Sequence, residues 1–327
     1  FLTQYSAEIV GALEKEVVVM NSLSVNLNLL MTSFYQPHGK KKKILMEHNA
    51  FPSDRYAVQS QLKLHGNHPI DDLIILAPDD GANITTNGIL DYFDQHGEGI
   101  AMVLIGGVNY YTGQAFNMKA ITNKAHEHNC LVGFDLAHAT GNTGLKLHDW
   151  GVDFATWCGY KYLNGGPGAP SGVFIHEGHL GKTDIPRFEG WWGHDKSTRF
   201  EMPDEFIPID TAEAWQLSNP PILAMAPLLA SLEIFHEAGM KNLIKKSNQL
   251  TQFLEKLILT ELGAKIEIIT PTNPNDRGCQ LSLRLVNLMP NIMDKLHDVG
   301  IIADWREPDV IRIAPVPLYN TFVECYE

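Results

Sequence analysis

The chain has 327 residues, of which 44% are hydrophobic and 19% charged, a composition that is ordinary for a globular protein with a substantial core. Its formal net charge of −13 argues against a nucleic-acid-binding protein, because affinity for phosphate backbones depends on lysine and arginine. No apolar stretch approaches the roughly 18 residues that a membrane span needs. Four cysteines in a chain of this length do not suggest a disulfide scaffold, so we expect a reducing, cytoplasmic location.

Short apolar runs alternate with helical stretches along the first half of the chain. The runs are typical of strands, and the segments 25–35 and 114–128 between them have helical periodicity. Such alternation predicts a mainly parallel sheet with helices on both faces. The seven predicted strands begin at about residues 16, 43, 72, 100, 130, 153 and 172.

The pattern changes at about residue 240. A long helix at 240–262 is followed by strands at 265–270 and 279–285, a helix at 289–300, and strands at 301–307 and 310–316, with no closing helix indicated after them. We therefore expect a large domain over 1–239 and a small C-terminal α/β domain over 240–327. Because the chain begins at Phe1 without an initiator methionine, we also expect a further segment upstream.

Unusual residues collect where the predicted strands end, which is the edge at which such sheets bind ligands. They are Ser24, Phe51–Asp54, Gly106–Tyr111, Asp135–His138 and Tyr160–Lys161. A metal site is not expected, because His126, His128 and Cys130 are spaced two apart on a helix and do not share a face. The motif LGKT at 180–183 is not a P-loop, since His176 stands where the upstream glycine is required.

Asp135 and Lys161 together favour a pyridoxal 5'-phosphate site, with His138 close by in sequence. Taken singly, an aspartate at a strand end is often a cap and a lysine is often exposed to solvent. As a pair they meet the needs of this cofactor, because the lysine forms a Schiff base with its aldehyde and the aspartate keeps its pyridine nitrogen protonated. The helix after Ser22 offers N–H groups for the phosphate, and Phe51 offers a face for the ring.

Several motifs in order along the chain resemble kynureninases. They are NAFPSD (49–54), YYTGQ (110–114), GFDLAHATGN (133–142), the run from His148 to Gly168, GWWGHDKSTRF (190–200), LSNPPIL (217–223) and IRIAPVPLYN (311–320). The resemblance implies the aspartate-aminotransferase fold, also called fold type I, and a homodimer. It also implies hydrolysis of L-kynurenine or 3-hydroxy-L-kynurenine to anthranilate or 3-hydroxyanthranilate and L-alanine. The choice between these substrates stays open, as does a role in tryptophan catabolism or in NAD biosynthesis.

The resemblance also implies roles for individual residues. Lys161, Asp135 and Tyr111 are the expected catalytic residues, and Tyr111 is either a proton donor or a phosphate ligand. Arg312 is the expected ligand of the substrate α-carboxylate. Trp191 and Asn219 are expected to reach the cofactor from the partner subunit, so that the homodimer shares its sites. The remaining cofactor contacts implied are Leu23, Ser24, Phe51, Pro52, Ser53, Asp54, Gly106, His138 and Tyr160.

Two positions depart from the family pattern, because Gly106 stands where some relatives have serine and Ser24 where threonine is common. Two alternatives also stay open. One is another fold type I enzyme such as a cysteine desulfurase, which would need a catalytic cysteine on a mobile loop. The other is a truncated, inactive fragment that only binds the cofactor.

Overall fold

The computed structural model describes residues 2–79, 81–287 and 291–327. Its centre is a seven-stranded sheet in the order β1-β7-β6-β5-β4-β2-β3, in which β7 runs antiparallel to both of its neighbours and the other pairs are parallel. The predicted, mainly parallel sheet is confirmed. The strands are β1 (Val17–Met20), β2 (Lys43–Glu47), β3 (Leu73–Leu76), β4 (Ile100–Gly106), β5 (Leu131–Asp135), β6 (Phe154–Trp157) and β7 (Ser171–Ile175).

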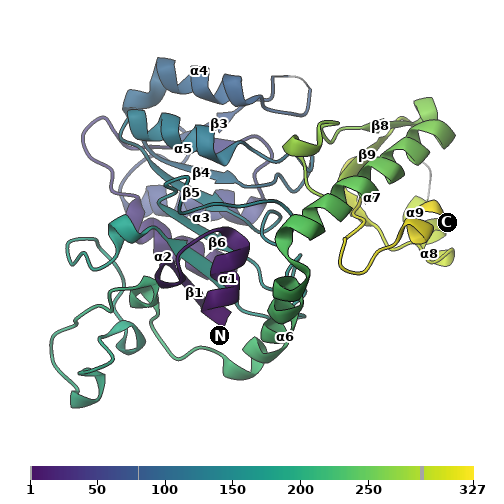
Figure 1. Cartoon of the computed structure of the whole chain (residues 1–327). Coiled ribbons are helices and arrows are strands. Elements are labelled where there is room, and N and C mark those ends of the chain that lie inside the picture. The colour runs from purple at the N-terminus through teal and green to yellow at the C-terminus, as the bar shows by residue number, and fades with distance from the viewer. Residues whose placement is uncertain (1, 80, 288–290) are drawn as a thin grey trace.

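Helices cover both faces of this sheet, as Figure 1 shows. On one face, α2 (Leu23–Phe34) and α3 (Pro52–Leu64) bury residues such as Leu30 and Val58 against the strands. On the other face lie α1 (Leu2–Val10), α4 (Thr86–His96), α5 (Met118–Glu127) and α6 (Ile222–Ala238). Because every strand is apolar on both faces, the sheet is enclosed in the way expected for parallel strands.

The C-terminal part forms a second sheet of four antiparallel strands in the order β10-β11-β9-β8, drawn in green to yellow in Figure 1. The strands are β8 (Ile266–Ile268), β9 (Leu281–Leu285), β10 (Asp304–Arg306) and β11 (Val310–Ile313), with the helices α7 (Met240–Glu261) and α8 (Ile292–Asp298). Positions 289 and 290 of the predicted helix 289–300 lie outside the described residues.

Two adjoining helices mark the change between the sheets. α6 and α7 meet at Gly239, whose φ of +74° favours glycine, and their axes differ in direction by 83°. The predicted domain boundary at 239/240 falls at this bend and stays a prediction. Among the described residues no single helix is long and apolar enough to cross a membrane, and only the bent pair α6–α7 reaches the required length and composition together.

The expectation that no helix closes the chain is wrong, because the short helix α9 (Phe322–Tyr326) ends it. A capping box explains the helix. The Thr321 hydroxyl accepts a hydrogen bond from the Glu324 N–H, and the Glu324 carboxylate accepts one from the Thr321 N–H. The sequence TFVE carries this signal at 321–324.

Candidate active site

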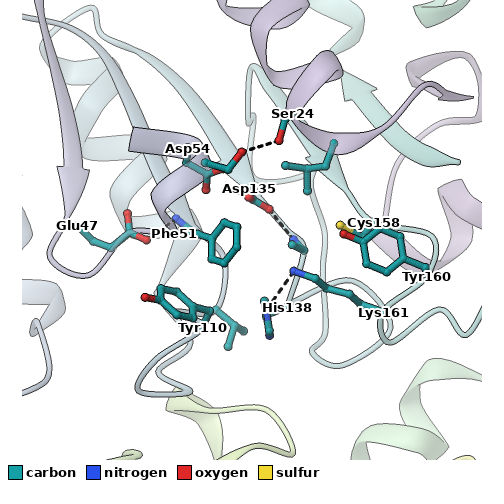
Figure 2. A pocket seen from close by; sticks show the side chains of 15 residues that line it. Ser24, Glu47, Phe51, Asp54, Tyr110, Asp135, His138, Cys158, Tyr160 and Lys161 are labelled. Carbon is teal, nitrogen blue, oxygen red and sulfur yellow. Dashed lines mark hydrogen bonds between the residues drawn. The ribbon is translucent and has the colours of Figure 1, made fainter. Parts of the chain in front are cut away.

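The C-terminal ends of β2, β4, β5 and β6 border a hollow, shown in Figure 2. This is the edge of the sheet at which open α/β folds bind ligands. The parallel register brings the strand ends together, since Gly106 at the end of β4 pairs with Asp135 at the end of β5. Ten residues expected from the sequence line the hollow: Leu23, Ser24, Phe51, Ser53, Asp54, Gly106, Asp135, His138, Tyr160 and Lys161.

Lys161 enters this cavity from the turn after β6. Its Nζ lies 3.2 Å from Nε2 of His138 and 5.6 Å from the centre of the Phe51 ring. The turn needs glycine for close approach: a Cβ on Gly159 would lie 2.2 Å from the carbonyl oxygen of Pro170. The glycine-rich run around the lysine therefore folds tightly enough to bring the amine under the aromatic ring.

His138 is held neutral beside this amine. Burial lowers its pKa well below the ordinary value, and the positive charges of Lys161, Arg312 and Arg306 lower it further. Its Nδ1 atom is buried and has no hydrogen-bond partner among the described residues. A neutral imidazole next to the amine accepts or shares a proton without adding to the positive charge of the site.

Three carboxyl groups meet at the other side of the cavity. Glu47, Asp54 and Asp135 are 3%, 5% and 7% exposed. Burial raises the pKa of Glu47 to about 7, partly opposed by the hydrogen bond from the Gly106 N–H (3.1 Å). Burial, and then the charge of the adjacent Asp135, raise the pKa of Asp54 well above its ordinary value.

These carboxyl groups have hydrogen-bonding capacity to spare. Asp135 Oδ1 accepts a bond from the Ala137 N–H (2.7 Å), while Glu47 Oε2 and Asp54 Oδ1 are buried and unpaired in the part of the chain that the structure describes. Buried polar atoms of this kind are rare in native proteins unless a ligand completes them. A protonated ring nitrogen, which is a cationic N–H donor, fits this acidic pocket.

Hydroxyl groups and a helix N-terminus form a third side. The Oγ atoms of Ser24 and Ser53 are 2.7 Å apart, and Leu23 and Ser24 form the first turn of α2. Ser22 precedes this helix but makes no side-chain cap to it within the described ranges. The N–H groups of the first turn, the positive end of the helix dipole and the two hydroxyls suit a phosphate group.

Tyr160 borders the same side of the cavity, with half of its surface exposed. Its phenol contacts the buried thiol of Cys158; this contact and burial raise the pKa of Tyr160 to about 12. The hydroxyl therefore keeps its proton at neutral pH and is available to donate a hydrogen bond.

Tyr111 is not brought into the cavity, and its neighbour Tyr110 lines it instead. Asn109 Oδ1 accepts hydrogen bonds from the N–H groups of Tyr111 and Thr112, which shapes a tight turn. The Tyr110 ring lies edge-on to Phe51, with ring centres 5.2 Å apart. The phenol of Tyr111 lies beside Arg284, and its pKa is raised mainly by burial.

Four other expected residues lie outside the cavity lining. Pro52 occupies the first position of α3, and Arg312 approaches from the second sheet, where its Nη1 donates to the Tyr110 carbonyl oxygen (2.6 Å). Trp191 lies in the long segment between β7 and α6, which projects from the body at the lower left of Figure 1. Its indole N–H donates to the Arg199 carbonyl oxygen, and Asn219 is exposed.

The structure adds five lining residues to those expected. Val108, Tyr110 and Ala137 lie within the strand-end ranges predicted from the sequence but had no individual role, whereas Glu47 and Cys158 were missed. A signal for Glu47 was present, because it closes the apolar run KILME in the same way that Asp135 closes LVGFD. Two acidic residues at the C-terminal ends of β2 and β5, the parallel strands on either side of β4, are expected to face one site.

Fold and cavity together define the class, a fold type I chain of the aspartate-aminotransferase type. Solved structures with this fold include an apo cysteine desulfurase from Thermococcus onnurineus, with a TM-score of 0.82 and 18% identity over 99% of this chain and 80% of that one. A complex of the cystine C-S lyase C-DES with cysteine persulfide has a TM-score of 0.83 at 18% identity, covering 99% and 83%. At this identity the similarity concerns the fold alone.

Sequence comparison gives the family. The kynureninase from Koribacter versatilis is 53% identical over 326 residues, which cover 99% of this chain and 77% of the relative, and the kynureninase from Myxococcus xanthus is 52% identical over 99% and 76%. The profile of the kynureninase C-terminal domain matches residues 243–327. The chain belongs to the kynureninase family, and it spans about three quarters of the length of these relatives.

Proposed function

We propose that this chain hydrolyses the Cβ–Cγ bond of L-kynurenine or 3-hydroxy-L-kynurenine with pyridoxal 5'-phosphate, releasing an anthranilate and L-alanine. The observation that supports this best is the position of Lys161, whose amine reaches the face of Phe51 between an acidic pocket and a phosphate-binding helix end. Membership of the kynureninase family selects the reaction among those that this fold supports.

The residues present fit this cofactor, and each side of the cavity has a share in holding it. Phe51 would pack on one face of the ring, and the buried carboxylate of Asp135 would hold a proton on the ring nitrogen. Ser24, Ser53 and the first turn of α2 bind the phosphate, with Tyr160 donating from the rim. Gly106 lies beside Glu47 and Asp135, so it belongs to the ring-nitrogen side and not to the phosphate side.

Lys161 is the residue that transfers the proton in this proposal. When bound, the cofactor supplies an electron-withdrawing ring that stabilises negative charge at the substrate α-carbon. Lys161 removes the proton from that carbon and returns it later, and the neutral His138 lets the amine alternate between its protonation states. Arg312 binds the α-carboxylate and thereby fixes the orientation of the C–H bond that breaks.

A second copy of the chain supplies Trp191 and Asn219 in this proposal. Both lie away from the cavity of their own chain, and an exposed indole in a projecting segment suits an intersubunit contact. The protein is then a homodimer with shared sites and a cytoplasmic enzyme of tryptophan breakdown or NAD biosynthesis. Pro52 acts through the backbone of its loop, and Tyr111 acts through the turn that places Tyr110.

A cysteine desulfurase activity fits the chain less well. The four cysteines are free, and Cys130, Cys158 and Cys279 are buried. Burial raises the pKa of Cys158, the cysteine that lines the cavity, and so disfavours its nucleophilic thiolate. Cys325 lies in α9 and not in a loop over the cavity.

The test begins with the absorption spectrum of the purified protein with added pyridoxal 5'-phosphate, followed by addition of L-kynurenine and recording of anthranilate fluorescence. Lys161→Ala is expected to lose the lysine-bound absorption and at least about a hundredfold of the turnover, because it removes both the covalent partner and the base. Lys119→Ala, which removes an exposed lysine on α5, is the matched control.

Cofactor binding without anthranilate release from the unaltered chain would support the inactive fragment instead. Normal turnover by Lys161→Ala would overturn the assignment.

A further inference from the structure

Two arginines and one aspartate share a face of the β10–β11 hairpin. Asp304 on β10 pairs directly with Arg312 on β11 in the antiparallel register. Arg306 follows Asp304 by two residues, and side chains two apart on a strand point to the same side. The fold therefore places three charged side chains together, and a directly opposed pair of opposite charge is favourable in a sheet.

A single carboxylate oxygen serves both guanidinium groups. Asp304 Oδ2 accepts from Arg312 Nη2 at 2.6 Å and from Arg306 Nη2 at 2.9 Å. The side chain of Arg312 is only 9% exposed, whereas those of Arg306 and Asp304 are 37% and 45% exposed. Asp304 thus fixes the position of one buried and one accessible cation.

Both guanidinium groups approach the cavity at the same residue. Their Cζ atoms each lie 5.9 Å from the centre of the Tyr110 ring, whose edge-on partner is Phe51. Both charges also act on His138, which lines the cavity and whose pKa they help to lower. Arg306 is therefore as near to the Tyr110 ring as Arg312, and its charge also reaches His138, although with the smaller effect.

Arg306 and Arg312 together have unpaired hydrogen-bond donors and an excess of positive charge. The Nε atoms of Arg306 and Arg312 are both buried and lack a hydrogen-bond partner among the residues described here. Two guanidinium groups that share one carboxylate keep an excess of one positive charge. An anion with one negative charge and two oxygens would neutralise that excess and use the free donors.

We propose that Arg306 is a second ligand of the substrate α-carboxylate beside Arg312, and that Asp304 is the positioning residue that holds both arginines toward the cavity. The inference rests on the proposed function, because it assumes an amino-acid substrate bound with its carboxylate at Arg312. The proposed role of Arg312 alone gives Arg306 no function in the site, whereas a clamp of two arginines uses all three charged side chains.

The decisive experiment measures preference for a carboxylate, not turnover alone. L-Alanine and L-alaninamide are titrated separately into the cofactor-loaded protein, and each dissociation constant is taken from the change in the absorption of the bound cofactor. The amide keeps the amine but has no negative charge. The unaltered protein should bind L-alanine more tightly than the amide, and the ratio of the two constants reports the carboxylate clamp.

Arg306→Gln is expected to reduce this ratio about tenfold to a hundredfold, with Arg306→Lys between the two, because one charge-assisted contact is lost or weakened. With L-kynurenine the same variant should raise KM by a similar factor and change kcat less. Asp304→Asn should also reduce the ratio. A larger ratio in that variant would mean that Asp304 competes with the substrate, and it would overturn the positioning role.

Arg284→Gln is the control, since Arg284 lies on the adjoining strand β9, pairs with Glu267 and does not line the cavity. An unchanged ratio in Arg306→Gln, with turnover of L-kynurenine intact in the unaltered protein, would sink this inference alone. A carboxylate preference that depends on Arg306, without any release of anthranilate, would keep the clamp and overturn the proposed function. Absence of any preference in the unaltered protein would overturn the clamp.

Discussion

Glu47→Gln should stabilise the protein at alkaline pH and have little effect at acidic pH. Glu47 is 3% exposed, ends β2 inside the acidic pocket, and has a pKa raised to about 7 chiefly by burial. In the unfolded chain the same group titrates near 4.5. The folded state therefore holds its proton more tightly, so the unaltered protein loses stability as the pH rises from about 4.5 to about 7.

The size of the effect follows from these two values. Each unit of pKa difference corresponds to about 1.4 kcal/mol, so the gap between 4.5 and about 7 amounts to roughly 3 kcal/mol above neutral pH. Glutamine keeps an oxygen that can accept the N–H of Gly106 and carries no charge at any pH. The stability of the variant should therefore show almost none of this decrease as the pH rises.

Urea unfolding without added cofactor measures this difference at acidic and at alkaline pH. The free energy of unfolding of Glu47→Gln, relative to the unaltered protein, should increase by about 3 kcal/mol from about pH 4.5 to pH 8. Glu98→Gln is the control, because it removes an exposed carboxyl group. An increment for Glu47→Gln that stays constant across this pH range would show that the carboxyl group is not held protonated by the fold, and the reasoning would be refuted.

Two further changes test the fold. Gly133→Ala should destabilise the sheet by about 1–3 kcal/mol in urea unfolding, because the new Cβ would lie 2.1 Å from the Phe154 ring; an unchanged midpoint would contradict the tight packing of β5 on β6. His126→Ala should destabilise the protein more at pH 6 than at pH 9. The hydrogen bond to Asp153 raises the pKa of His126. The ion pair therefore stabilises the folded state below the unfolded pKa of about 6.5, and this stabilisation disappears as the pH rises through the raised pKa. Equal losses of stability at both pH values would argue against the ion pair.

The sequence predicted the large sheet well because its strands are short, apolar and separated by helical stretches. Each predicted strand corresponds to an observed one within a few residues, as for the run at 130–135 and β5. Local patterns were weaker at the C-terminus, where the capping box at Thr321 was overlooked. Strand order is a property of long-range contacts, so the sequence alone did not establish that β7 runs against its neighbours.

Residues that line the cavity were predictable where they end a buried strand or lie in the turn after it, as Asp135 and Lys161 do. They were less predictable where either of two consecutive residues could point into the cavity. Of two consecutive tyrosines, the turn made by Asn109 sends Tyr110 to the cavity and Tyr111 toward Arg284, and no periodicity in the sequence distinguishes them. Such a choice depends on side-chain hydrogen bonds to the backbone of a tight turn.

The charges in and around the cavity are separated, with carboxyl groups on one side and cations on the other. Three buried carboxyl groups gather at the ends of β2 and β5 and the start of α3, and the cations Lys161, Arg306 and Arg312 lie on the side of the second sheet and the glycine-rich turn. Burial, and to a lesser extent nearby like charges, raises the pKa of Glu47 and Asp54 on the acidic side and lowers the pKa of His138 on the cationic side. This separation suits the proposed binding of a cationic ring nitrogen on one side and an anionic carboxylate on the other. In the proposed complex the acidic side holds the cofactor and the cationic side holds the substrate carboxylate. This arrangement favours one orientation of the substrate α C–H bond before any bond is broken, which is the condition for selecting the reacting bond.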